Sequence, residues 1–192
     1  MKRLRTISLL MLVASVVILP ALAAAQVDNF GKIDTVYADV AKINDNNWTI
    51  TISCTNDESV VGLSVPLRMT AGMTKVVADS AIYTGGRVET FDYKGMRADT
   101  AIQCVTLGMI ANLGPTHKIL DAGSGRLVTI FVSSLDKKPI EKLDVDTTTT
   151  NPNNSLLVIA STVQGGATPD TIPIANREII EIRPAFVAKQ VD

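Results

Sequence analysis

The polar segment DVDTTTTNPNN carries the side chains in this chain that are best suited to bind a hard cation. Asp144, Asp146 and Asn151 offer carboxylate and amide oxygens, which are the ligands that Ca²⁺ prefers in proteins. The spacing does not match an EF-hand, because the sixth position from Asp144 is Thr149 instead of glycine and the twelfth is Ser155 instead of glutamate. We expect a polar loop here, with an irregular calcium site as the alternative.

The motifs that could support catalysis are incomplete. Ser134 and Lys137 fit the S-x-x-K pattern of a serine nucleophile, but the companion S-D-N and K-T-G elements are missing from the chain. His117 is the only histidine and lies in the loop LGPTHK, without a nucleophile elbow beside it. The glycines of DAGSGR are not followed by the G-K-[ST] of a phosphate-binding loop. The sequence therefore predicts no enzyme and no cofactor.

The two cysteines both fall on the apolar side of an alternating segment. Cys54 shares its parity with Ile50 and Ile52, and Cys104 shares its parity with Ile102, so both thiols should point inward. In an oxidising compartment they could form a disulfide, which would close a loop of about 50 residues and contribute about 4 kcal/mol. The alternative is a pair of buried free thiols that pack as small hydrophobes.

A few side chains are of the types that anchor protein interfaces. Tyr83, Arg87 and Tyr93 are candidates to contact a partner, because tyrosine and arginine dominate the binding energy of many interfaces. The same residue types are also ordinary constituents of a β-sandwich. Trp48 is in phase with the apolar residues that follow it in WTITISC, and we expect it in the core.

The N-terminal segment has the pattern of a secretory signal peptide. A basic start with Lys2 and Arg3 precedes an apolar run over 7–19, and Ala23 and Ala25 form an A-x-A cleavage site. We expect a signal peptide over residues 1–25 and a single domain over 26–192. Export would place this domain outside the cell, at the cell surface or in the periplasm of a bacterium. The rest of the chain has no second apolar run of spanning length, so we expect no membrane span after cleavage.

The charge balance of the expected mature domain argues against a nucleic-acid partner. The signal segment carries three of the 18 basic residues and none of the 19 acidic ones. Fifteen basic residues then face 19 acidic residues, which gives a net charge of −4. Binding to the phosphate backbone of nucleic acid requires the opposite sign.

Period-two alternation dominates the rest of the chain and predicts β-strands. In SVVGLSVPLRM, Val61, Leu63 and Val65 occupy every second position, which is typical of a half-buried strand. Pro66 lies inside this strand and cannot donate to a ladder, so we expect an edge strand or a bulge. Gly85-Gly86 predicts a hairpin turn. The expected strands lie within residues 34–43, 48–54, 59–69, 74–84, 87–93, 100–110, 126–135, 155–163 and 177–188.

Eight or nine strands with turn residues between them predict an all-β, antiparallel sandwich of jelly-roll or immunoglobulin-like type. Five segments also resemble cohesin-like domains of secreted bacterial surface proteins: DTV at 34–36, VGLSVPLRM at 61–69, ADS at 78–80, GGRVETF at 85–91 and GSGRLVTIFV at 123–132. The resemblance implies a nine-stranded jelly roll that works by binding. In classical cohesins the partner is a dockerin, a calcium-loaded module.

Two functions follow as hypotheses. The first is a secreted, non-catalytic binding module of the cell envelope or extracellular matrix. Its ligand would be a protein, such as a dockerin, or a surface polysaccharide. The second is a structural subunit that self-associates by strand addition, with the segments 26–40 or 177–191 as donors. A carbohydrate-binding protein or an enzyme ranks below both.

Overall fold

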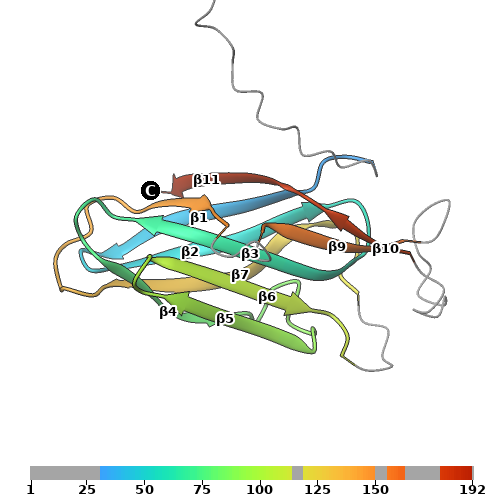
Figure 1. Ribbon diagram of the computed structural model, residues 1–192, viewed down its shortest axis with the longest axis horizontal. Helices are drawn as coiled ribbons and strands as arrows, with labels where there is room; N and C mark the ends of the chain where they lie inside the picture. Colours follow the sequence, from blue (N-terminus) through green and yellow to red (C-terminus); the bar gives the residue numbers. More distant parts are fainter. Residues whose placement is uncertain (1–30, 114–118, 150–154, 163–177, 192) are drawn as a thin grey trace, which may run out of the picture.

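The computed structural model describes residues 31–113, 119–149, 155–162 and 178–191. These residues form two sheets packed face to face, so the predicted all-β sandwich is confirmed (Figure 1). The predicted signal peptide lies outside the described residues. The described residues contain eleven strands instead of the expected eight or nine: β1 Thr35–Asn44, β2 Asn47–Asn56, β3 Val60–Thr70, β4 Val76–Ile82, β5 Tyr93–Asp99, β6 Cys104–Ile110, β7 Gly123–Ser134, β8 Asp144–Thr147, β9 Leu157–Thr162, β10 Glu178–Ile182 and β11 Ala185–Val191.

The first sheet has the order β11-β1-β2-β7-β4, and the second has the order β10-β9-β3-β6-β5. Strand β8 joins the second sheet by pairing with one end of β3. The strand pairs of the described residues are antiparallel except one, because β11 runs parallel to β1. We call the two layers the β1 sheet and the β3 sheet.

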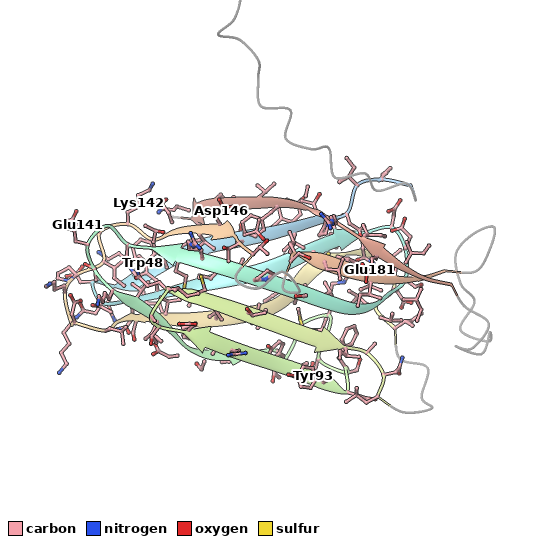
Figure 2. All side chains as sticks on the ribbon, in the orientation of Figure 1. Trp48, Tyr93, Glu141, Lys142, Asp146 and Glu181 are labelled. Carbon is pink, nitrogen blue, oxygen red and sulfur yellow. The ribbon has the colours of Figure 1, made fainter. Side chains whose placement is uncertain are left out.

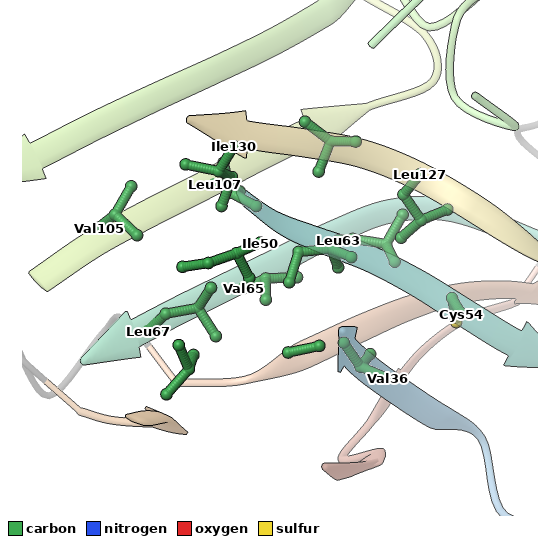
Figure 3. Packing of buried hydrophobic residues seen from close by; sticks show 14 of the residues in the cluster. Val36, Ile50, Cys54, Leu63, Val65, Leu67, Val105, Leu107, Leu127 and Ile130 are labelled. Carbon is green, nitrogen blue, oxygen red and sulfur yellow. The ribbon is translucent and has the colours of Figure 1, made fainter. Parts of the chain in front are cut away.

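Alternation of the side chains places one face of each central strand in the core. In β2, Trp48, Ile50 and Ile52 are buried while the residues between them are half-buried on the opposite face. Trp48 retains 5% of its exposure, which confirms its predicted place in the core. Figure 3 shows aliphatic side chains from both sheets meeting between the layers. Burying each such side chain contributes about 1.5–3 kcal/mol, and this contact holds the sheets together.

Pro66 lies in the middle of a sheet instead of at an edge, because its neighbouring strand changes beside it. On one side β3 pairs with β6 throughout. On the other side β9 pairs with 60–64 and β8 pairs with 67–70, which leaves Pro66 between them. Its carbonyl accepts hydrogen bonds from the Thr148 amide at 3.2 Å and the Thr147 hydroxyl at 3.3 Å. Since N and C=O of a strand residue point to the same side, the missing N–H faces this junction and no ladder bond is lost.

Two expected strands differ from the structure, and the segment DVDTTTTNPNN, expected to be a polar loop, begins with strand β8, because its first residues pair with the end of β3. The segment RVETFDY is a series of turns until β5 begins at Tyr93, and it places Val88 and Phe91 in the core. The expected last strand is divided at Pro184 into β10, which belongs to the β3 sheet, and β11, which belongs to the β1 sheet. Proline interrupts the ladder here, and the chain crosses from one layer to the other.

The predicted disulfide is not formed, although the prediction that both cysteines are buried is confirmed. Cys54 and Cys104 are free. Cys54 lies near the end of β2 and is paired with Val36, whereas Cys104 begins β6 and is paired with Arg68 at the far end of β3. A disulfide requires Cα atoms within about 7 Å, and the two cysteines lie at opposite ends of strands in different sheets, too far apart to meet this limit. Figure 3 shows Cys54 and Val105, the neighbour of Cys104, at opposite ends of the core.

Both thiols should be unreactive in the folded protein. Burial, helped by the negative charge of Asp34, raises the pKa of Cys54 to about 12, so very little thiolate is present at neutral pH. Cys104 is 2% exposed, which prevents contact with a reagent. We expect no reaction with a thiol reagent such as Ellman's reagent under native conditions and two reacting thiols per chain in denaturant. Rapid labelling of the native protein would contradict the buried positions.

Candidate binding face

The two outer faces of the sandwich have different chemistry. On the β1 sheet, most outward positions of β2 and β7 carry hydroxyl side chains, with Phe131 among them, and Thr51 and Thr129 meet across these strands with their oxygens 3.5 Å apart. On the β3 sheet, the outward positions at the end that contains Tyr93 and Ile110 are mostly apolar residues or glycine, whereas Arg68 and Arg97 are exposed toward the other end. Apolar surface on an exposed sheet is the feature that marks an interaction site.

A row of outward positions crosses the five strands of the β3 sheet. In register, it runs from Glu181 on β10 through Ile159 on β9, Gly62 on β3 and Ile110 on β6 to Tyr93 on β5. Ile110 is 41% exposed and Tyr93 is 47% exposed. Apart from the exposed Glu181 at one end, its members are apolar residues or glycine, and we call it the apolar row. Figure 2 shows Tyr93 at the end of β5 and Glu181 on β10, the two ends of the row.

The surface beside the apolar row carries few side-chain atoms, because glycines occupy several of its positions. A β-carbon added at Gly95 would lie 2.4 Å from the Tyr93 hydroxyl oxygen, and one added at Gly108 would lie 3.5 Å from the Tyr93 ring. The ring therefore lies over these two glycines. In the same way, a β-carbon added at Gly62 would lie 3.2 Å from the side chain of Ile159. The arrangement presents an aromatic ring and aliphatic groups on a smooth surface, which suits contact with another protein.

Tyr83, a predicted partner-binding residue, is used inside the domain. It is half-buried and its hydroxyl donates to the Gly95 carbonyl at 3.1 Å, which joins the end of β4 to the edge of β5. Burial, with a smaller contribution from Tyr93, raises the pKa of Tyr83 to about 12. The hydroxyl therefore stays protonated and remains a donor at neutral pH. Of the two predicted tyrosines, Tyr93 is the one that faces outward.

Arg87, the third predicted partner-binding residue, is also engaged internally. Its Nη1 donates to the carbonyls of Cys54 and Gly123, both at 3.1 Å, and to Asn56 Oδ1 at 2.9 Å, while Nη2 donates to the Asp121 carbonyl. Burial lowers the pKa of Arg87, and nearby anionic groups including Asp121 oppose this effect. The guanidinium thereby links the 83–92 segment to the end of β2 and the start of β7, so it has little left to offer a partner.

The calcium candidates lie on β8, away from the apolar row. Asp144 and Asp146 are both exposed and alternate along this strand. Asp144 pairs with Lys142 at 2.6 Å, and Asp146 Oδ1 accepts from the Thr147 amide at 2.7 Å. Asn151 lies outside the described residues. The structure thus places the two aspartates near each other but gives each a local partner.

A different set of carboxylates comes together at the opposite end of the sandwich. Oxygens of Asp34, Asp57 and Glu58 lie within 4.8 Å of one another, the one such group in the part of the chain that the structure describes. Asp57 Oδ2 also accepts from the Lys32 amide at 2.7 Å. Sequence reasoning missed this group because Asp34 is a whole hairpin away from the other two along the chain.

The serine of the S-x-x-K pattern takes part in a local network of polar contacts. The Ser134 hydroxyl donates to Asp136 Oδ1 at 3.0 Å, and Asp136 in turn pairs with Lys138 at 3.0 Å. These contacts lower the pKa of the Asp136 carboxyl, mainly through Lys138. Ser134 therefore bonds a carboxylate in a turn instead of a lysine base. His117 lies outside the described residues.

Comparison with known proteins identifies the fold. No protein-family profile and no curated protein matches the chain. Among solved structures, the seventh ScaB type I cohesin from Pseudobacteroides cellulosolvens is similar, with a TM-score of 0.56 and 6% identity over 83% of this chain and 94% of that one. Two cohesin–dockerin complexes from Clostridium thermocellum are also similar, Coh-OlpA with a TM-score of 0.53 and 10% identity, and Coh-OlpC with a TM-score of 0.52 and 6% identity. Coverage is 83% of this chain and 100% of the first, and 84% of this chain and 96% of the second.

At identities this low, the structural similarity establishes the architecture alone. The nature of the partner has to be inferred from the surface of this chain. None of the described segments forms a helix with the length and apolarity needed to span a bilayer. The resemblance first noted in the core and turn segments is confirmed at the level of the fold. This chain has the β-sandwich fold of cohesin modules.

Proposed function

We propose that this chain is an exported, non-catalytic module that binds a protein partner through the outer face of the β3 sheet. The observation that carries the proposal is the apolar row, in which Ile110 and Tyr93 stay exposed on an otherwise regular sheet. Leu113 extends the apolar surface, because its amide donates to Asp92 beside Tyr93 and its side chain is exposed. The similar solved structures include cohesins in complex with dockerins, which supports a protein ligand.

The chemistry of this face favours a protein over a polysaccharide. A protein interface needs a central apolar anchor surrounded by polar groups. Tyr93 and Ile110 supply the anchor, while Asp92 beside Tyr93 and Glu181 at the other end of the row are exposed polar residues. The apolar row is also remote from Asp144 and Asp146, so binding should not depend on calcium held by these two aspartates, although a dockerin partner would need calcium itself.

The test compares three variants against calcium-loaded dockerin modules and against proteins extracted from a bacterial envelope. Ile110→Lys places a charge beside Tyr93 on this face and should weaken binding about a hundredfold. Gly95→Ala should also weaken binding, because the added β-carbon would overlap the Tyr93 hydroxyl and displace the Tyr93 ring. Thr49→Lys, on the outer face of the β1 sheet, is the matched control and should bind normally. Binding is measured by calorimetry.

All three variants should unfold at nearly the same temperature as the parent chain, since the changed positions are exposed or half-buried. A protein ligand that binds all three equally would contradict the proposed face. A ligand lost only with Thr49→Lys would place the interface on the β1 sheet and overturn the proposal. Retention of envelope polysaccharide with no protein ligand would contradict a protein-binding function.

A further inference from the structure

The last described strand, β11, is held to the domain mainly through its backbone. It pairs with β1 in parallel from Thr35↔Ala185 to Ala41↔Val191, without a bulge. Five of its seven residues are exposed, and Phe186 is its only side chain packed against the core. Strands with this little buried apolar area separate from a domain at far lower cost than central strands do.

The side-chain contacts of β11 are few and lie at the surface. Lys189 Nζ lies 3.5 Å from Asp39 Oδ1, and Gln190 Nε2 donates to the Leu143 carbonyl at 3.3 Å. An exposed ion pair contributes roughly 0–1 kcal/mol. The ladder with β1 is therefore the principal attachment, and any chain that presents the same segment can form it.

The hinge before β11 is unusually short. Only Arg183 and Pro184 separate β10 from β11, although the two strands belong to different sheets. Figure 1 shows β10 and β11 following one another along the same edge of the sandwich. Ile182 is buried and anchors β10, so movement is confined to the two hinge residues. A short hinge that contains proline favours exchange of the following strand between copies.

Two other edges of the sandwich, those of β5 and β4, carry features that hinder strand pairing, whereas the β1 edge is regular. The edge of β5 is covered at Gly95 by the Tyr83 hydroxyl. The edge strand β4 carries a bulge between Ala78 and Ser80. Bulges and blocked carbonyls are devices that prevent edge-to-edge association. Beneath β11, by contrast, β1 offers an unbroken seven-residue ladder.

We propose that β11 exchanges between two copies of this chain, each copy placing residues 185–191 on the β1 edge of the other. Exchange rebuilds the same ladder, the same Phe186 packing and the same Lys189–Asp39 pair. The free-energy difference between the closed and exchanged forms is then limited to the hinge and to association. The occupant is a second copy, because these contacts are specific to this segment.

The test uses the register pair Asp39 and Lys189, whose side chains touch. Single variants Asp39→Cys and Lys189→Cys, one of them carrying an affinity tag, are mixed at high concentration, oxidised and separated without reductant. Exchange predicts a disulfide between position 39 of one chain and position 189 of the other. The yield should exceed by about tenfold that of Asn44→Cys mixed with Lys189→Cys, a control for random collision. The native thiols Cys54 and Cys104 are buried and do not interfere.

Two further variants sharpen the result. The double variant Asp39→Cys/Lys189→Cys should form its disulfide within one chain when it is oxidised in dilute solution and then stay monomeric by light scattering. Three glycines inserted after Arg183 should reduce the dimer fraction, because a longer hinge lets the strand close on its own domain.

Two outcomes would overturn strand exchange. The first is a cross-link yield equal to that of the Asn44→Cys control. The second is dimerisation of Lys189→Cys alone through two copies of position 189, which would show that the β11 edges pair side by side. Neither outcome depends on the apolar row, so the proposal is tested separately from the proposed binding function.

Discussion

Replacing Arg87 with methionine should lower the free energy of unfolding by about 3 kcal/mol, one of the two largest effects of a single substitution that we predict for this domain. Methionine keeps the unbranched stem and removes all donors. The carbonyls of Cys54, Gly123 and Asp121 would each lose a charge-assisted hydrogen bond. The buried Asn56 would lose the donor to its Oδ1, which lies 2.9 Å from Nη1.

This effect is large because the Arg87 guanidinium connects its own segment to the end of β2 and to the start of β7. Asn56 is 3% exposed, and its Nδ2 also donates to the carbonyls of Glu58 and Asp121. Loss of Arg87 therefore disturbs a connected set of buried polar groups, and such sets are costly when they are only partly satisfied. Arg87→Lys should recover part of the stability, because an ammonium can reach fewer of these acceptors in this geometry.

The measurement is chemical denaturation followed by Trp48 fluorescence. Arg126→Met is the matched control, because the Arg126 side chain donates only to the Thr84 carbonyl and the Thr129 hydroxyl among the described residues, and this substitution should cost less than about 1 kcal/mol. Equal losses for the two methionine variants would show that the Arg87 contacts contribute no more than an ordinary surface arginine does.

The second large effect is expected from Gly86→Ala, which should lower the free energy of unfolding by about 3 kcal/mol. A β-carbon at Gly86 would lie 2.2 Å from the Leu127 carbonyl oxygen and 2.9 Å from that of Tyr83. Both obstacles are backbone atoms. Leu127 is buried and is the extra residue where the β2–β7 register shifts, so β7 cannot move away without disturbing the core.

Gly85→Ala provides the control for this prediction. Gly85 has φ +70°, which costs an alanine about 1 kcal/mol, but its added carbon would meet only the mobile end of Arg126, at 2.9 Å. A rule based on backbone angles alone predicts that Gly85 is the more sensitive position. The structure predicts the reverse order in thermal unfolding, and a larger loss for Gly85→Ala would contradict the close approach of the 83–92 segment to β7.

The strands of this protein could be predicted from its sequence because side-chain direction in a strand is a local property. Period-two alternation in TITISC already separates Ile50, Ile52 and Cys54 from the hydroxyl residues between them, and the structure buries all three. The core and turn segments that resemble cohesins reflect the same local requirements. For this reason the fold class and the burial of both cysteines were predictable.

Predictions that depended on which strands are neighbours were less successful, since pairing is a long-range property. Parity shows that Cys54 and Cys104 point inward, but not that they lie at opposite ends of two different sheets. In the same way, Pro66 required an interrupted ladder, and the structure supplies the interruption in the middle of a sheet by changing the neighbour from β9 to β8.

The candidate site divides along the same line. Tyr93 was a candidate from its residue type, whereas Ile110 was counted only as part of an apolar strand. The sequence by itself determined most of the strands, their buried faces and the absence of any complete catalytic motif, because these depend on residues close together in the chain. The tertiary structure alone decided that Ile159, Gly62, Ile110 and Tyr93 share one row and that Arg87 is enclosed by backbone carbonyls. Both depend on register and on sheet order, which arise only when distant segments pack together.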